Sequence, residues 1–214
     1  MKDFRKNGLT LAEAARVFSG HRNARVLLPA AATAIAARAL MGRFTRRDAV
    51  VAGAAVAMEP FVEWLVHVHV LHAKYRKGEE TLIARSHRMH HQDPRDPGLV
   101  FIPEHVVLPA VAGIAVINAV LLRRPRAVMT GVATTWTLLA AYEWTHFLIH
   151  SSYVPKTALY RTLRRTHQLH HFRNENYWYG IITPVSDKVL NTYPGKDEVP
   201  PSKTVKNLGV TESV

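Results

Sequence analysis

The sequence contains no cysteine in its 214 residues. This absence excludes disulfides, iron–sulfur clusters and thiol nucleophiles, so any bound metal must use nitrogen and oxygen ligands. Acidic residues are also scarce, with 16 Asp and Glu against 28 Lys and Arg, which gives a net charge of +12. Such a charge calls for an anionic partner, either nucleic acid or a phospholipid surface. Because no basic stripe is interleaved with aromatic residues, we expect a membrane as the partner and no nucleic acid.

Four apolar runs supply the membrane-compatible segments, at residues 26–41, 49–72, 106–122 and 127–141. The first run is short for a span of about 20 residues, but the side chain of Arg38 can reach the interface. The connector at 123–126 is short enough to force its two helices into an antiparallel hairpin. We therefore expect an all-α integral membrane fold of about four helices, arranged as two transmembrane hairpins at 26–72 and 106–150.

The chain has the length of a single domain. Residues 1–25 are interpreted as an N-terminal lead-in without the pattern of a signal peptide. Within it, 9–18 predicts an amphipathic helix that is either solvated or at headgroup depth. Residues 26–193 form the expected membrane domain. The segment 194–214 has low hydrophobicity and is expected to be disordered.

Histidines carry the clearest functional signal, because ten of the 13 fall into four clusters. The clusters are His67-x4-His72, His87-x2-His90-His91, His146-x3-His150 and His167-x2-His170-His171. Helix positions i, i+3 and i+4 share one face, so each H-x-x-H-H motif offers three imidazoles toward one point. Neutral imidazole binds iron, zinc, copper and nickel. Ten ligands exceed the four that one zinc uses, so the sequence predicts two metals with about five ligands each.

The first histidine cluster leaves two interpretations open. Residues i and i+5 diverge by about 140° on an ideal α-helix, so His67 and His72 would not share a face. Either the helix is distorted there, for instance by a π-bulge, or His69 and His72 are the true pair.

Two segments carry a family resemblance. Soluble di-iron bundles use Glu and Glu-x-x-His ligands, whereas nitrogen ligands dominate here. YEWTHFLIHSS at 142–152 and HQLHHFRNENYWYGIITPVSDKVLNTY at 167–193 resemble motifs of the fatty acid hydroxylase superfamily, which includes sterol desaturase-like enzymes and fatty acid 2-hydroxylases. The resemblance covers about 60–194. Glu143 stands in place of the usual Asp, Ser151 in place of a further His, and Ser186 in place of Trp, which leaves the subfamily open.

The resemblance implies a histidine-rich helical cap that faces the cytosol and holds two metal ions. These ions are iron in the active enzyme, and zinc can replace them in the purified protein. It implies that O2 is a co-substrate. It assigns ligand roles to His67, His72, His87, His90, His91, His146, His150, His167, His170 and His171.

Several other polar residues are candidates for orienting a ligand imidazole. Glu63 and Glu143 each precede a tryptophan in related half-motifs, and their alternative role is a carboxylate satisfied by the backbone or by Arg. The remaining candidates are Tyr142, Asn174, Asn176 and Asp187.

These features together predict a membrane-bound di-iron monooxygenase that hydroxylates or desaturates a C–H bond of a lipid or fatty-acyl substrate. It would need a separate electron-donor protein of the ferredoxin, rubredoxin or cytochrome b5 type. A β-carotene-type hydroxylase is the first alternative, and a non-catalytic metal-binding membrane protein is the second. Seven Lys and Arg lie at the hairpin tips, which leaves 21 of 28 on the histidine face. This total favours a cytosolic metal site, in the cell membrane of a bacterium or the endoplasmic reticulum of a eukaryote. The seven tip residues lie in very short loops, where the positive-inside rule counts most, and they favour the opposite orientation.

Overall fold

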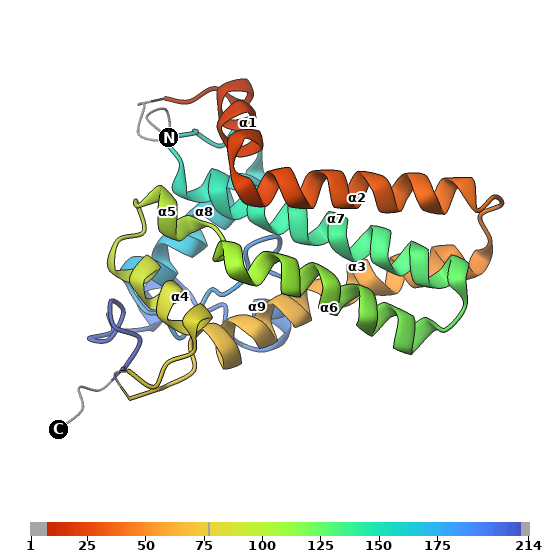
Figure 1. Ribbon diagram of the computed structural model, residues 1–214. Coiled ribbons are helices and arrows are strands. Elements are labelled where there is room, and N and C mark those ends of the chain that lie inside the picture. The colour runs from red at the N-terminus through yellow and green to blue at the C-terminus, as the bar shows by residue number, and fades with distance from the viewer. Residues whose placement is uncertain (1–7, 77, 211–214) are drawn as a thin grey trace.

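Long helices lie side by side in the computed structural model, and shorter helices gather at one end of them (Figure 1). The structure describes residues 8–76 and 78–210, and no β-strand occurs within these ranges. The long helices are α2 (Arg22–Leu40), α3 (Arg46–Val66), α6 (Glu104–Leu122) and α7 (Pro125–His150). The shorter elements are α1 (Leu11–Gly20), the π-helix η2 (His67–Leu71), α4 (Leu82–Gln92), α5 (Pro97–Val100), α8 (Ala158–Phe172), α9 (Val185–Val189) and the 3-10 helix η3 (Lys196–Glu198).

The predicted pair of hairpins is confirmed. Helices α2 and α3 are joined by a short turn in which Gly42 adopts φ 83°. Between α6 and α7, Arg123 adopts a left-handed φ of 57°, and Pro125 starts α7 at its first position. Proline at that position costs no hydrogen bond, because the first amide of a helix has no internal partner. Both tips therefore lie at the end of the bundle opposite the short helices (Figure 1).

Helix α7 is the centre of the bundle, because it packs against α2, α3 and α6. Its contact with α6 is especially close at Gly131. A Cβ atom at this position would lie 2.0 Å from the Oδ1 atom of Asn118. The amide of Asn118 in turn donates to the Ile114 carbonyl at 2.9 Å and to the Thr135 hydroxyl at 3.3 Å. Small residues allow such close approach of helices in apolar surroundings.

Arg38 differs from its predicted role. Its side chain does not extend to an interface but is buried, with 2% of its surface exposed. The guanidinium forms an ion pair with Asp48 at 2.8 Å and donates to the Thr130 hydroxyl at 2.8 Å. Thr130 also donates to Asp48 at 2.6 Å. A buried charge is tolerated only when it is paired and hydrogen-bonded, and this network joins α2, α3 and α7 near the hairpin tips.

Two helical stretches are long and apolar enough to cross a membrane, Arg46–Leu71 and Pro97–Leu122. Their most apolar windows are only 11% and 6% buried inside the protein. A core helix of a soluble protein would be largely buried, whereas these stretches expose their apolar side chains. The arrangement fits a membrane protein by length, composition and exposure.

The amphipathic helix predicted at 9–18 corresponds to α1. Ala14 and Phe18 on one face are buried in a cluster with Phe101 and Phe147, and most residues on the other face are exposed. The predicted disorder of the tail is wrong over 194–210, where the chain follows a defined path against the histidine-bearing helices. Residues 1–7 and 211–214, which belong to the predicted lead-in and tail, lie outside the described ranges.

Candidate metal centre

The first histidine cluster is built on a π-helix. The His72 amide donates to the His67 carbonyl at 2.9 Å, an i→i+5 hydrogen bond. This wider turn brings His67 and His72 above one another, which an α-helix would not do. His69 points elsewhere and contacts the ring of Trp64. Of the two interpretations left open by the sequence, the geometry thus favours the distorted helix with His67.

Helices α4 and α8 carry the two H-x-x-H-H motifs. Thr81 caps α4 by accepting from the Ala84 amide at 3.2 Å, and Thr157 caps α8 by accepting from Tyr160 at 3.3 Å. All three histidines of each motif are buried. The apolar bundle therefore ends in two short helices whose buried faces consist largely of imidazole.

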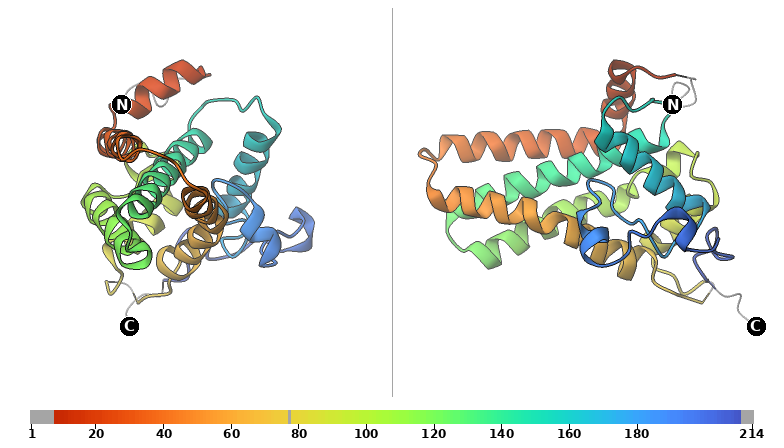
Figure 2. Two further views of the ribbon diagram at one scale, coloured as in Figure 1. Left: turned by 90° about the vertical axis from the view of Figure 1, so that its right-hand side faces the viewer. Right: turned by 180° about the vertical axis from the view of Figure 1, so that it is seen from behind.

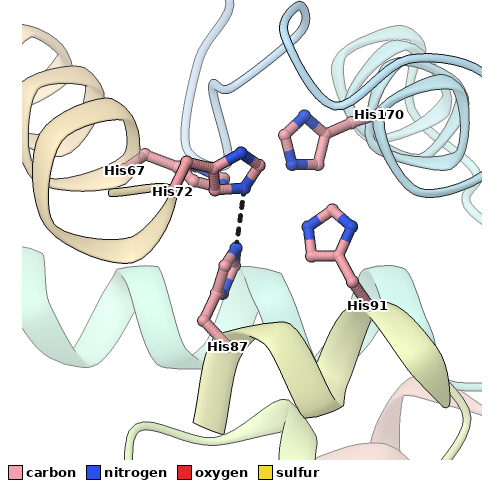
Figure 3. Close-up of side chains that lie close together, drawn as sticks. All are labelled: His67, His72, His87, His91 and His170. Atoms are coloured by element: carbon pink, nitrogen blue, oxygen red, sulfur yellow. Dashed lines mark hydrogen bonds between the residues drawn. The ribbon is translucent and has the colours of Figure 1, made fainter. Parts of the chain in front are cut away.

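The ten clustered histidines converge on two points. The first group contains His67, His72, His87, His91 and His170, and the second contains His90, His146, His150, His167 and His171. One ring nitrogen of each member lies within 4.8 Å of those of all other members of its group. Figure 3 shows the first group, with the rings from η2, α4 and α8 directed at a common space. His21 and His105, like His69, belong to neither group.

Each histidine group takes four members from one segment of the sequence and its fifth member from the other segment. Residues 67–91 supply four members of the first group and His90 to the second. Residues 146–171 supply four members of the second group and His170 to the first. Neighbours on a helix differ by about 100° in direction, so His90 and His91 face different groups, as do His170 and His171.

Distances between ring nitrogens match ligands of one ion. The Nε2 atoms of His72 and His87 lie 3.0 Å apart, and in the second group His150 and His167 lie 2.9 Å apart. For metal–imidazole bonds of about 2.0–2.1 Å, two ligands at a right angle are about 2.9 Å apart, and two at a tetrahedral angle about 3.4 Å. Both distances are short enough for the two rings of each pair to bind one ion.

Unpartnered ring nitrogens support the same conclusion. The Nε2 atoms of four histidines are buried without a hydrogen-bond partner within the described residues, in His67, His91, His146 and His170. A buried polar atom left unsatisfied costs about 1–3 kcal/mol. Each of these atoms belongs to one of the two groups, where a metal ion would satisfy it. The residues present thus fit a dinuclear metal site with imidazole ligands.

Backbone carbonyls fix the orientation of three of these rings. His67 Nδ1 contacts the Tyr179 carbonyl at 2.9 Å, His170 Nδ1 the Tyr177 carbonyl at 2.8 Å, and His91 Nδ1 the Val205 carbonyl at 3.0 Å. Because a carbonyl only accepts, each Nδ1 carries the proton and Nε2 is free to bind metal. Sequence reasoning missed these three positions, since a carbonyl is present at every residue and leaves no mark in the sequence.

The protonation of the cap histidines suits metal binding. Burial lowers the pKa of His170 to about 4 from its usual value near 6.5. Burial likewise holds the pKa of His90, His91 and His171 well below the usual range, and nearby histidines add to the shift. These imidazoles are therefore neutral at pH 7, which is the form that donates a lone pair to a metal.

The two candidate glutamates both accept hydrogen bonds from backbone amides. Glu143 accepts from the Ile102 amide at 2.8 Å and from Asn23 at 3.1 Å. Glu63 accepts from the Ile181 and Ile182 amides. Their described contacts correspond to the alternative role, a carboxylate satisfied by the backbone. They join α7 to the segment before α6, and α3 to the loop after α8, and so hold the histidine-bearing parts together.

The remaining candidates differ in whether they contact a histidine ring directly. Asp187 accepts from the Tyr179 amide at 3.0 Å and thereby supports the residue whose carbonyl orients His67. Tyr142 stacks on His146 with ring centres 5.9 Å apart. Asn174 accepts from the amide and side chain of Asn176, so these two stabilise the turn after α8 without contacting a ring.

An apolar cavity of about 580 Å³ lies between α3, α6 and α7 and reaches both histidine groups. Its wall includes His67 and His87 of the first group and His90 and His146 of the second. Away from the histidines the lining is mainly aliphatic, with Val62, Ala110, Ile114, Leu138 and Leu139 among its members. On α6 it extends from Val106 to Asn118, which is about 18 Å of helix.

A second cavity of about 630 Å³ also reaches the second histidine group, and it shares no lining residue with the first cavity. It reaches His150, His167 and His171, and its lining contains Asp93, Arg95, Ser152, Arg164 and Gln168. The two cavities thus offer an apolar and a polar approach to the same centre.

Comparison with known proteins identifies the family. The family model for fatty acid hydroxylase matches residues 52–192. The dihydroceramide fatty acyl 2-hydroxylase FAH2 of Arabidopsis thaliana is 32% identical over 113 residues, which cover 51% of this chain and 45% of that protein. The visible hydroxylase domain of full-length Scs7p shares the fold, with a TM-score of 0.72 at 22% identity over 85% of this chain and 68% of that one. The family match includes all ten clustered histidines and most of the chain, so the protein belongs to the fatty acid hydroxylase family.

Proposed function

We propose that the protein is a membrane-bound, histidine-ligated di-iron hydroxylase that acts on a lipid acyl chain. The observation that carries this proposal is the apolar cavity whose wall contains histidines of both groups. An aliphatic chain held there would lie beside two metal ions at once. The family membership and the partial similarity to a fatty acyl 2-hydroxylase support the same substrate class.

The protein's own residues would bind the acyl chain, orient it and exclude water from the site. Aliphatic side chains of α3, α6 and α7 would enclose the acyl chain, and burial of each of its methylene groups contributes about 0.8 kcal/mol to binding. The ten imidazoles hold two irons, which when bound would supply the activation of O2 and the oxidation of the C–H bond. Hydroxylation consumes O2, two electrons and two protons for each alcohol and water formed. We assign the supply of electrons to a separate donor protein of the ferredoxin, rubredoxin or cytochrome b5 type.

The proposed orientation places the exposed apolar stretches Arg46–Leu71 and Pro97–Leu122 in the bilayer and the histidine end in the cytosol. Most of the Lys and Arg residues belong to that end, and this total charge supports the proposed orientation. The polar cavity beside His150 would then face the aqueous phase, and the apolar cavity would lie at the depth of the acyl chains.

Lipid extracts test the function directly. Cells that express the protein should contain lipids with one added oxygen, detected by mass spectrometry and labelled when 18O2 is supplied. The His90→Ala variant should abolish this product, whereas His105→Ala, outside both groups, should retain it. Purified protein that holds metal tightly but oxidises no lipid with any of the three donor types would instead support a non-catalytic metal-binding protein.

A further inference from the structure

The C-terminal segment runs along the histidine-bearing end of the molecule. In the right-hand view of Figure 2 this segment, in dark blue, lies at the same end of the molecule as α8. The segment is attached to the turn after α8 by several hydrogen bonds. Arg173 donates to the Val199 carbonyl at 2.8 Å, and its own carbonyl accepts from the Ser202 amide at 2.7 Å. Asn174 donates to the Pro200 carbonyl at 3.1 Å.

The attachment continues toward the metal centre. The Thr204 hydroxyl donates to the buried carboxylate of Glu175. Lys206 donates to the His91 carbonyl at 2.9 Å, and its ammonium lies 4.7 Å from the centre of the Phe172 ring. Leu208 is buried with 5% of its surface exposed. Polar and charged side chains thus join the segment to α4 and to the end of α8, and an apolar side chain of the segment is buried.

One contact of this segment reaches a ring that faces the first histidine group. The Val205 carbonyl accepts from His91 Nδ1 at 3.0 Å, while the Nε2 atom of His91 is buried and has no partner within the described residues. Lys206, the next residue, holds the backbone of the same histidine. Both the ring and the backbone of His91 are therefore positioned from the C-terminal segment.

This arrangement lies beyond the part of the chain that resembles the family. The family match ends at residue 192, and the carbonyls that orient His67 and His170 lie within it. The carbonyl that orients His91 lies outside it. We propose that residues 199–210 form a strap that positions His91 and retains the metal of the first histidine group. The inference rests on the dinuclear centre of the proposed function.

The expected effect follows from how outer hydrogen bonds act on a ligand. A carbonyl that accepts from Nδ1 fixes the tautomer and the ring angle, and its loss typically costs about 10-fold to 100-fold in metal affinity. Only the first group contains His91, so only one of the two metals should be affected. Lys206 is a positioning residue in this scheme, since it touches His91 and not the metal space.

Zinc retention tests the strap without reference to oxidation. Full-length protein loaded with zinc is mixed with a chromophoric chelator, and the rate of release of each zinc is measured. A truncation after Glu198 should release one zinc about 10-fold to 100-fold faster and the other at the full-length rate. The control truncation after Val210 removes only residues 211–214 and should behave like the full-length protein.

Point variants keep the proposal testable if the truncated chain does not fold. Lys206→Met should accelerate the release of one zinc, Lys206→Arg should restore retention, and Lys203→Met on the same segment should have no effect. Release of both zincs from Lys206→Met at the rates seen for Lys203→Met would overturn the proposal. A common acceleration of both zincs would also overturn it, because it would indicate general loosening. Since zinc release involves no oxidation, failure of the proposed function leaves this result unchanged.

Discussion

His67 and His69 lie two residues apart, yet only His67 joins the first histidine group. Removing one of five ligands should weaken that group while leaving the other intact. We expect His67→Ala to bind about one metal per chain, and His69→Ala, which loses only a contact with Trp64, to bind about two. Metal analysis of the purified variants provides the measurement. Equal metal content in the two variants would contradict the assignment of His67.

Burial of neutral histidines also makes the fold sensitive to acid. The folded pKa of His170 is about 4, whereas an unfolded histidine titrates near 6.5. Between these values the unfolded chain binds more protons, so the free energy of unfolding falls as the pH decreases. The stabilisation is fully present above pH 6.5 and is lost as the pH falls toward 4.

Thermal unfolding of the metal-free protein tests this prediction. Its midpoint should drop between pH 7 and pH 5, and the drop should be smaller in His170→Gln. His105→Gln, which changes an exposed histidine outside both groups, should keep the dependence of the unchanged protein. A midpoint that rises toward pH 5 would give the opposite sign and reject the explanation.

At the scale of helices, the contact between α6 and α7 depends on one glycine. A methyl group at Gly131 would lie 2.0 Å from Asn118 Oδ1 and 2.7 Å from a methyl of Leu122. Overpacking of this kind costs about 1–3 kcal/mol. Gly131→Ala should therefore lower the free energy of unfolding in detergent by that amount. Gly113→Ala on the same pair of helices has open space around its Cβ and should leave stability nearly unchanged.

The helices also show which parts of the structure could be predicted from sequence. The apolar runs and the short connector at 123–126 were sufficient to predict the two hairpins, because the length of an apolar run and the length of a connector can be read from the local sequence. The spacing of H-x-x-H-H was sufficient for the i, i+4 pairs His87–His91 and His167–His171, but the third histidine of each motif faces the other group and not the predicted common point. The central position of α7 was not predictable, because it depends on packing such as that of Gly131 against Asn118. The path of 194–210 was missed because its polar composition conceals contacts made by backbone carbonyls.

For the whole molecule, the apolar cavity should set the length of acyl chain that is accepted. Ile114 lines it on α6, far along the helix from the histidines. Ile114→Trp should shorten the cavity and shift the products toward shorter acyl chains, with unchanged metal content. Leu121→Trp, at a position on α6 that is 73% exposed, provides the control. Chromatography of products from a mixture of acyl lengths measures the shift, and an unaltered distribution would exclude this cavity as the acyl site.

The contribution of His90 to the second group and of His170 to the first has a consequence for how the sequence varies in evolution. Each of the segments 67–91 and 146–171 would complete the coordination of an ion held mainly by the other segment. Neither segment alone contains all the members of either group. We therefore expect the two segments to vary in concert among related sequences, although they are separated by more than fifty residues.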